Sequence, residues 1–333
     1  MPATTSRRKR ASQSVLVATA LLLSGFAWAQ GDEPRDYPNR PLRIVVGFTP
    51  GGGPDVTARH LAQRLGETFK QPVIVENKPG AGGTVAAALV ARAPADGYTL
   101  LSVSSAHAAA AAIYPKLPYD TLKDLAGVTQ SATSKYVLVV PPSLGVRSVK
   151  DLLAAAKAKP GTINFSSAGV GSGTHFAAEV FKAMAAIDVV HVPFKGIPDA
   201  LGETVAGRVQ FFMAPIANGV NLVRDGRLVG LGVSSKNRDA LLPDVPTIDE
   251  SGVPGYEQEL WFGILAPAGV PRPVMAKLNA EISRVLSDPE TKKRWAPIGI
   301  EPRPTTPQQF DQLIAAETAL YTRIARAANI TSE

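Results

Sequence analysis

From residue 42 onward, short runs of β-branched and apolar residues alternate with longer alanine-rich stretches. The run LRIVVGF (42–48) predicts a buried strand, and VTARHLAQRLGETF (56–69) predicts the helix that follows it. The alternation continues with a strand over 72–77, a helix over 82–93 and a strand over 99–105. Strand, helix and strand at this spacing indicate an α/β protein in which helices cover both faces of a parallel sheet.

The same pattern starts again after about residue 135. Further strands are expected over 136–141, 163–168, 189–194, 209–214, 228–235 and 259–267, and helices over 174–186, 274–288 and 306–328. The stretch 236–258 is polar and dotted with proline, so it predicts mainly loop. We therefore expect two lobes, with 30–128 as the first part of lobe 1, 129–230 as lobe 2, and 231–333 returning to lobe 1.

The first 29 residues have the pattern of an export signal. Basic residues at 7–10 precede an apolar run over 15–27, and Ala27-Trp28-Ala29 fits the small-x-small cleavage pattern. This predicts a signal peptide over 1–29, cleavage after Ala29 and a periplasmic mature chain. A membrane anchor helix is the alternative, but the apolar run is well short of the ~20 residues that span a bilayer.

The charge balance changes when this segment is set aside. The whole chain has 35 Lys+Arg and 28 Asp+Glu; removing the four basic residues at 7–10 leaves 31 against 28, a net charge of +3 in place of +7. The support for nucleic-acid binding then largely disappears. The chain has no cysteine, which excludes disulfides, a thiol nucleophile and thiolate metal sites.

Glycine-rich segments follow three of the expected strands, each just before a helix. They are TPGGGPD (49–55), ENKPGAGG (76–83) and SSAGVGSGTH (166–175). Loops at the carboxyl ends of parallel strands present backbone N–H groups and a helix N-terminus, which together favour an anion. The alternative is that the glycines only make tight turns, which is harder to accept for three loops at equivalent places than for one.

None of these loops completes a known enzyme motif. The first lacks the Gly-Lys-Ser/Thr ending of a nucleotide phosphate loop, and Val85 and Phe176 stand where a dinucleotide fingerprint needs glycine in the other two. Ser172 lacks the flanking glycines of a nucleophile elbow. The loops therefore predict anion binding without chemistry.

The remaining candidate groups are ambiguous. The histidines at 60, 107, 175 and 191 stand apart in the sequence and predict no metal site. His175 lies near the start of its expected helix, where it either donates to a ligand or has a structural role. Asp55 either caps the helix expected from Val56 or binds a ligand amine.

The ordered series YPNRPLRIVVGFTPGGGPD, PVIVENKPGAGG, DGYTLL, LPYDTLKDL, HVPFKG, LPDVPTIDESGVPGYE and WFGILAPAGVP resembles the Bug receptors. These are the extracytoplasmic solute-binding proteins of tripartite tricarboxylate transporters, and the likeness covers nearly the whole mature chain. The resemblance implies an α/β, type II periplasmic binding protein fold, with two lobes of mainly parallel sheets joined by hinge strands. It also implies that the lobes close around one small organic carboxylate.

Carried over position by position, the resemblance implies a set of ligand-binding residues. In lobe 1 these are Phe48, Thr49, Pro50, Gly51, Gly52, Gly80, Ala81 and Gly82, with Asp55 and Ser104 beside them; in lobe 2 they are Ser167, Gly169, Gly171, Ser172 and His175, with Lys195 nearby. Ala214 marks a departure, because many relatives have an acid there that could meet a ligand amine. With alanine in place of that acid, a carboxylate ligand with an apolar or aromatic far end is favoured over an α-amino acid.

The resemblance implies a monomeric receptor without catalytic residues, metal or cofactor. Its partners would be the carboxylate and integral membrane permease subunits, or a sensor kinase ectodomain if the protein signals instead. An exported hydrolase is a further alternative, for which Ser172 and His175 are the best available nucleophile and base.

Overall fold

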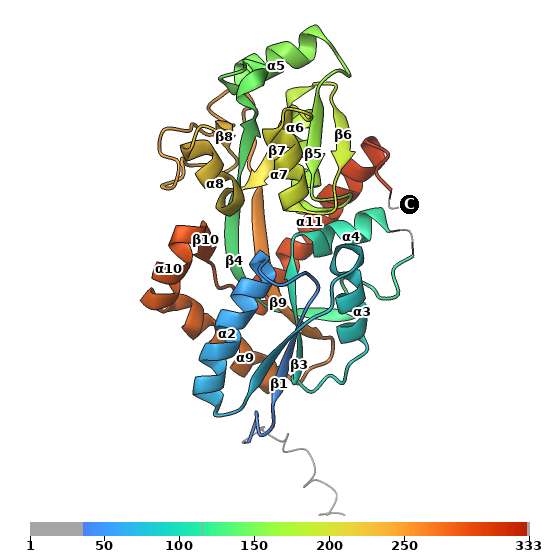
Figure 1. Cartoon of the computed structure of the whole chain (residues 1–333). Helices are drawn as coiled ribbons and strands as arrows, with labels where there is room; N and C mark the ends of the chain where they lie inside the picture. Colours follow the sequence, from blue (N-terminus) through green and yellow to red (C-terminus); the bar gives the residue numbers. More distant parts are fainter. Residues whose placement is uncertain (1–35, 115, 332–333) are drawn as a thin grey trace, which may run out of the picture. The chain divides into compact units, whose positions relative to one another are not determined.

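The computed structural model describes residues 36–114 and 116–331, so the predicted signal peptide and its cleavage point lie outside the described residues. By its contacts the chain divides into an N-terminal unit, residues 1–37, and a unit that begins at Pro38. The second unit contains all the helices and strands described below, and helices and strands alternate along it (Figure 1).

The first half of this unit carries one sheet and the helices around it. Its elements are β1 (Leu42–Val46), α2 (Gly53–Phe69), β2 (Val73–Asn77), a 3-10 turn (Ala81–Gly83), α3 (Thr84–Ala91), β3 (Thr99–Ser104) and α4 (Ala106–Ile113). β1 lies between β2 and β3 and pairs parallel with both. Because these strands are parallel, the loops after β1 and β2 leave the same edge of the sheet.

A second sheet is built from the middle of the chain. Its elements are α5 (Val149–Ala158), β5 (Asn164–Ser167), α6 (Gly173–Ala185), β6 (Val190–Pro193), α7 (Ile197–Val205), β7 (Phe211–Pro215), α8 (Ile216–Arg224) and β8 (Val229–Val233). Within it, β5 pairs parallel with β6 and β7. The loop from β5 to α6 is the third glycine-rich segment.

The strand β4 (Leu125–Val140) belongs to both sheets. Its first part pairs antiparallel with β9 (Glu259–Pro267) and β10 (Ile300–Pro302), and its last part pairs antiparallel with β7 and β8. The strands that carry the glycine loops are therefore parallel, while those that join the two halves are antiparallel. This confirms the two-lobed α/β class with connecting strands.

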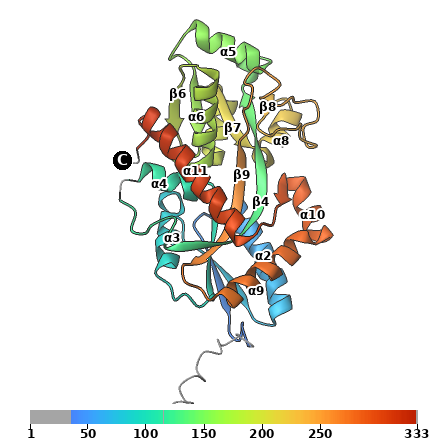
Figure 2. The same ribbon diagram turned by 180° about the vertical axis from the view of Figure 1, so that it is seen from behind.

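The C-terminal helices return to the first sheet. They are α9 (Arg272–Ser287), α10 (Pro289–Trp295) and α11 (Pro307–Ala327), which starts with a capping box between Thr306 and Gln309. Figure 2 shows α11 crossing in front of β4 and β9, toward α4 and α6. Its Tyr321 packs on Phe176 of α6, with ring centroids 4.5 Å apart, so the helix contacts both halves.

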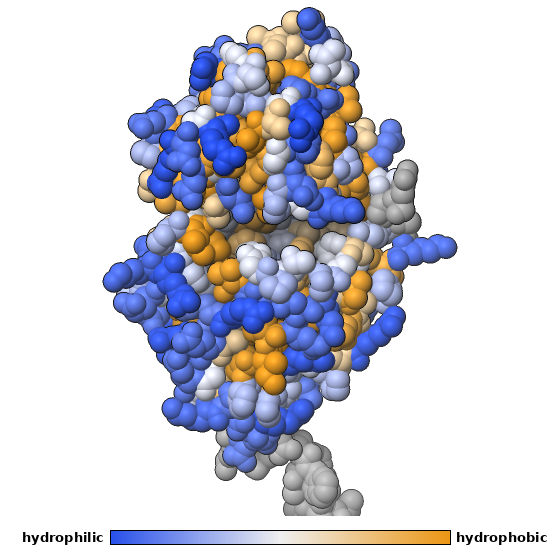
Figure 3. Space-filling model, in the orientation of Figure 1, coloured by the Kyte–Doolittle hydropathy of each residue, from blue (hydrophilic) through white to orange (hydrophobic). Residues whose placement is uncertain are grey.

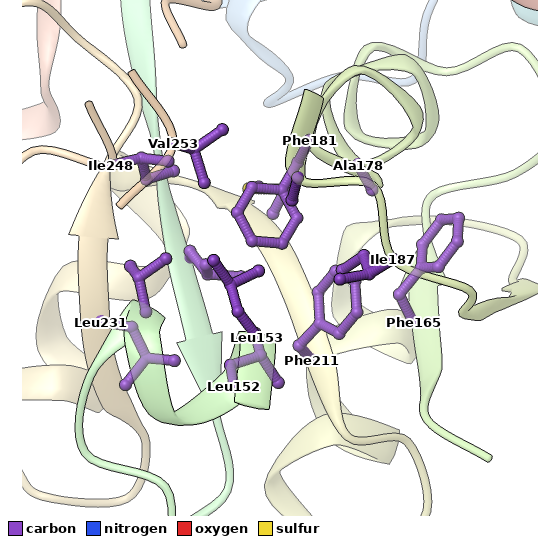
Figure 4. Packing of buried hydrophobic residues seen from close by; sticks show 14 of the residues in the cluster. Leu152, Leu153, Phe165, Ala178, Phe181, Ile187, Phe211, Leu231, Ile248 and Val253 are labelled. Carbon is purple, nitrogen blue, oxygen red and sulfur yellow. The ribbon is translucent and has the colours of Figure 1, made fainter. Parts of the chain in front are cut away.

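The second sheet has its own apolar core. Phe165, Phe181 and Phe211 are fully buried in it, and Figure 4 shows them packed with aliphatic side chains from α5, α6 and β8. Ile248, Val253 and Tyr256 belong to the same cluster. Residue 231, where the return to lobe 1 was predicted, lies inside β8, and these three residues after it still pack with the second sheet.

Several elements differ from the sequence prediction. α2 starts at Gly53, three residues before the predicted start at Val56, because Pro54 occupies the first turn, where its missing N–H costs nothing. α4 was not predicted because its alanines show no amphipathic stripe; most of its residues are buried. β4 runs over 16 residues, although only 136–141 was expected, since its first part is rich in Ser, Thr and Gln that the neighbouring strands bury.

Among the residues described, none of the helices is long and apolar enough to span a bilayer.

Candidate ligand-binding site

The first glycine loop is held in shape by Asp55. Its carboxylate accepts hydrogen bonds from the Gly51 N–H (2.9 Å), from Nε of Arg59 (2.9 Å) and from Nδ2 of Asn77 (2.8 Å). Burial would raise the pKa of Asp55, but these hydrogen bonds outweigh it and hold the pKa below its ordinary value. Asp55 is only 2 % exposed and its carboxylate already accepts three hydrogen bonds, so it offers almost no surface to a ligand amine.

Asp55 is also not the helix cap that we expected. The N-cap of α2 is Gly52, and Asp55 lies in the first turn, from which it bonds back to Gly51. Gly51 has φ +87°, a left-handed conformation that suits glycine. The Gly51 N–H is therefore used inside the loop and is not a donor for a ligand.

The second loop contains a left-handed run. Ala81, Gly82 and Gly83 have φ values of 45°, 64° and 95° and form a 3-10 turn before α3. This loop touches the first, because a Cβ on Gly47 would lie 2.7 Å from the Cα of Gly83. Only a glycine at position 47 allows the two backbones to approach this closely.

The third loop is closed by its own side chains. Ser172 caps α6 by accepting the His175 N–H at 3.2 Å, and its hydroxyl also bonds Oγ1 of Thr174 at 2.9 Å. Gly171 donates its N–H to Nδ1 of His175 at 3.1 Å. Ser167, Ser172 and His175 thus build the loop, and their polar atoms already have partners.

The end of α4 contacts both the second and the third loop. A Cβ on Gly171 would lie 2.0 Å from Cδ1 of Ile113, so α4 contacts the third loop without a gap. The neighbouring Tyr114 approaches the second loop, with its hydroxyl 3.9 Å from the Cβ position of Gly82. The face in Figure 3 is hollowed between the halves that carry the two sheets, with apolar and weakly polar residues around the hollow.

Several amide groups of these loops make no hydrogen bond within the part of the chain that the structure describes. They include the N–H groups of Thr49 and Gly53 in the first loop, Ala81 and Gly82 in the second, and Val170 in the third. Thr49, Ala81, Gly82 and Val170 are exposed. Neutral donors of this kind bind a carboxylate through charge-assisted hydrogen bonds without the desolvation cost of a buried ion pair.

Below the first two loops lies a small cavity of about 10 Å³, close to the minimum that holds one water. Ser104, Ser102, His107 and Tyr119 line it, together with the loop glycines 47, 82 and 83. Burial lowers the pKa of His107 to about 4, so the ring is neutral at pH 7, and its Nε2 has no partner among the described residues. Ser104, a predicted site residue, therefore lies beneath the loops and is only 6 % exposed.

Two predicted residues lie elsewhere. Ala214 is fully buried in the core around β7, where a Cβ on Gly219 would lie 3.3 Å from its side chain, so it presents no surface to a ligand. The inference drawn from the missing acid at this position loses its basis. Lys195 lines a groove of about 780 Å³ along α7, beside Gly169 and Val170, and is exposed without an ion pair in the described chain.

The geometry gives no support to hydrolase chemistry. The imidazole of His175 contacts the Gly171 N–H and Glu179, while the Ser172 hydroxyl contacts Thr174 and the His175 backbone. Within residues 36–114 and 116–331, no group of three His, Asp or Glu residues is close enough to hold a metal ion.

Two α/β halves that share long strands and carry glycine-rich loops with unpaired amides at their junction are typical of a two-lobed solute-binding protein. A family model described as tripartite tricarboxylate transporter family receptor matches residues 57–330, and the chain belongs to this family of periplasmic solute-binding receptors. The predicted family is confirmed.

Three relatives illustrate the similarity. Protein BugT of Bordetella pertussis is 34 % identical over 296 residues, which cover 87 % of this chain and 90 % of BugT. The R. palustris protein Rpa4515, solved with adipate, has a TM-score of 0.80 and 34 % identity over 89 % of this chain and 99 % of its own. MatC from Rhodopseudomonas palustris, solved with bound malate, has a TM-score of 0.76 and 33 % identity over 86 % and 99 % of the two chains.

Sequence reasoning missed Ile113, Tyr114, Val170, Asn77 and His107. Ile113 and Tyr114 follow an alanine run with no motif, and Val170 is only the spacer between two glycines. Asn77 ends the strand before the second loop, and a polar side chain at that place is the one available sign of its role. His107 was noticed only as an isolated histidine.

Proposed function

We propose that this chain is a periplasmic receptor that captures one small organic carboxylate at the junction of its two lobes. The observation that carries the proposal is the set of unpaired amide N–H groups on three glycine-rich loops around the end of α4. Adipate and malate are the ligands of two solved relatives, which supports a carboxylate as the class of ligand.

The ligand sits between Thr49–Gly53 and Gly80–Gly82 on one side and Gly169–Ser172 on the other. Phe48 lies beside the second loop, 3.5 Å from the Cβ position of Gly83, and Pro50 shapes the first turn. Asp55 and His175 act on the ligand only through the loops they hold. We propose that the chain passes from lobe 1 to lobe 2 within β4 and returns between Tyr256 and β9. β4 and β9 would then act as the hinge.

A thermal-shift screen tests the ligand class. Mono-, di- and tricarboxylates, keto acids and nicotinate-like aromatics are compared with their neutral amides at the same concentration. A binding carboxylate raises the melting temperature by linkage, about 2.7 kcal/mol of stabilisation at a concentration 100-fold above Kd. A melting temperature that rises with sugars or cations but with no organic acid would contradict the proposal.

The site also predicts that the receptor has no catalytic activity. The ligand bound at saturation should be recovered unchanged, and chromogenic esters should not be turned over. We further propose cleavage of the signal peptide after Ala29, which N-terminal sequencing of the exported protein tests.

Within its family the receptor would present its closed form to integral membrane permease subunits. A sensor kinase ectodomain is the alternative partner. Both partners would recognise the closed form, so a pull-down from membranes with and without the ligand separates the two by the class of membrane protein that is captured.

A further inference from the structure

Two histidines that are 16 positions apart in the sequence lie against each other beneath the third loop. The rings of His175 on α6 and His191 on β6 have centroids 3.8 Å apart and an interplanar angle of 14°. Phe165 of β5 stacks on His191 with centroids 4.9 Å apart. His175 is only 2 % exposed, so the pair forms part of the lobe's interior.

Each ring holds one glycine amide of the loop. Nδ1 of His175 accepts the Gly171 N–H at 3.1 Å. Nε2 of His191 lies 2.6 Å from Oγ of Ser167, and that oxygen accepts the Gly169 N–H at 3.1 Å. His175 acts directly, and His191 acts through Ser167.

The residue between these two glycines is Val170. Its neighbours on both sides are fixed by the histidines, while its own amide has no acceptor in the described chain. Val170 is 41 % exposed and follows Gly169, whose φ of 118° requires glycine.

We propose that His175 and His191 are positioning residues, which hold Gly171 and Gly169 so that the Val170 amide points its N–H toward the ligand. This inference rests on the proposed carboxylate site and assigns a role to residues that do not touch the ligand. Fixing the loop before binding lowers the ordering cost that the ligand would otherwise have to meet.

The hydrogen bond at His175 requires a neutral ring, whereas Nε2 of His191 can accept from or donate to the Ser167 hydroxyl, which also lies 3.2 Å from the Gly169 carbonyl oxygen. An acceptor at Nδ1 of His175 places the ring proton on Nε2, which lies 3.8 Å from Oε1 of Glu179. Protonating Nδ1 would set an N–H against the Gly171 N–H. The charged groups that act on the pair within the described chain are Glu179 and Lys182, both on α6.

The electrostatics keep the rings neutral. Burial lowers the pKa of His175 to about 3, with His191 and Lys182 adding to the effect. Burial and Lys182 lower the pKa of His191 to about 4. Both values are lower in the folded chain than in the unfolded one, so this stabilisation is complete above about pH 6.5 and is lost as pH falls toward these values.

Matched substitutions test the proposal. Asn places an oxygen near the position of Nδ1, and Gln places a polar group near that of Nε2, so His175→Asn and His191→Gln keep the hydrogen bonds. His175→Leu and His191→Leu keep the bulk and remove them. The first readout needs no ligand: amide hydrogen exchange at Gly169 and Gly171, measured by NMR on the folded proteins.

The Leu variants should exchange these amides at least tenfold faster than the wild type, while the Asn and Gln variants retain protection. With adipate as the probe, the Leu variants should bind about tenfold more weakly and the polar variants close to wild type. In the wild type, the Gly171 amide signal should shift as pH falls from 5 to 3, where the His175 ring becomes protonated, and this shift should vanish in His175→Asn. The pH series is read without ligand because adipate's own carboxyls titrate in this range.

Two results would overturn the proposal: Leu variants that keep amide protection, or polar variants that lose it as fully as the Leu variants while remaining folded. If adipate does not bind the wild type, the proposed ligand class is questioned, and the exchange measurements still decide the role of the histidines.

Discussion

The amide of Gly51 donates a hydrogen bond to the carboxylate of Asp55 at 2.9 Å, so the acid of the first glycine loop closes the loop itself. Its other contacts, Arg59 and Asn77, are also donors. All three groups donate to the carboxylate, so the side-chain NH2 of an asparagine at this position would face a donor.

Asp55→Asn should therefore weaken carboxylate binding. The Asn amide group must face at least one donor, which loses a hydrogen bond to a charged group and opens the loop, and we expect about a tenfold rise in Kd. Isothermal titration measures it. Asp244→Asn, at an exposed position, is the control and should bind like the wild type; an unchanged Kd in Asp55→Asn would show that the loop does not depend on this carboxylate.

Gly171→Ala should prevent α4 and the third loop from approaching each other. The new methyl group would lie 2.0 Å from Cδ1 of Ile113, and φ at this position is +77°. We expect weaker binding and partial rescue in the double variant with Ile113→Ala, with a coupling energy of about 1 kcal/mol or more from a double-mutant cycle. Additive effects would mean that backbone strain alone, and not the contact with Ile113, causes the loss.

The variant Ser172→Ala distinguishes a role of Ser172 as a helix cap from a role as a catalytic nucleophile. Ser172 caps α6, so its removal should lower the free energy of unfolding by about 1 kcal/mol. Denaturant unfolding measures this loss. Ester turnover should be absent in both the wild type and the variant, and a turnover that the substitution abolishes would revive the hydrolase alternative.

Glu317 should make stability fall as pH rises toward neutrality. It lies on α11 and accepts the Nε1–H of Trp261 on β9 at 2.6 Å. Burial raises the pKa of Glu317 to about 7, against the lowering effect of hydrogen bonds from Trp261 and Tyr321. The folded pKa is above the unfolded value, so this contribution is complete below about pH 4.5 and is lost as pH rises through 7.

Thermal unfolding between pH 5 and 8 checks this dependence. In Glu317→Gln, which keeps an acceptor for Trp261 and has no proton to lose, the fall in melting temperature over this range should become smaller. The lowered pKa values of the histidines act in the opposite direction at lower pH. A pH profile identical to that of the wild type would show that Glu317 titrates normally.

Most strands were predictable from the sequence, whereas the helices α4, α5, α7, α8 and α10 and the short strand β10 were not predicted. The strand over 259–267 was predicted at its observed bounds, and the last helix differs from its prediction by a single residue at each end. Both have a strong period and clear end signals, which depend only on neighbours along the chain. α4 could not be predicted because buried alanines on all sides give no period.

The candidate site was predictable as loops but not as contacts. The three glycine segments were identified by composition alone, and they do lie at carboxyl ends of parallel strands. Gly51 and Arg59 lie four positions from Asp55, but the contact between Asp55 and Asn77, 22 positions away, and the burial of Ala214 by the core depend on segments distant in the sequence.

The sequence by itself determined the alternation of strands and helices, the three glycine-rich loops and, through its ordered motifs, the receptor family. The tertiary structure alone decided that His175 meets His191, that Ile113 closes on Gly171, and which amides remain without acceptors. The physical reason is the separation along the sequence over which each interaction acts. Hydrophobic period and turn chemistry act within a few residues, whereas hydrogen-bond saturation and close packing are settled only when distant segments are brought together.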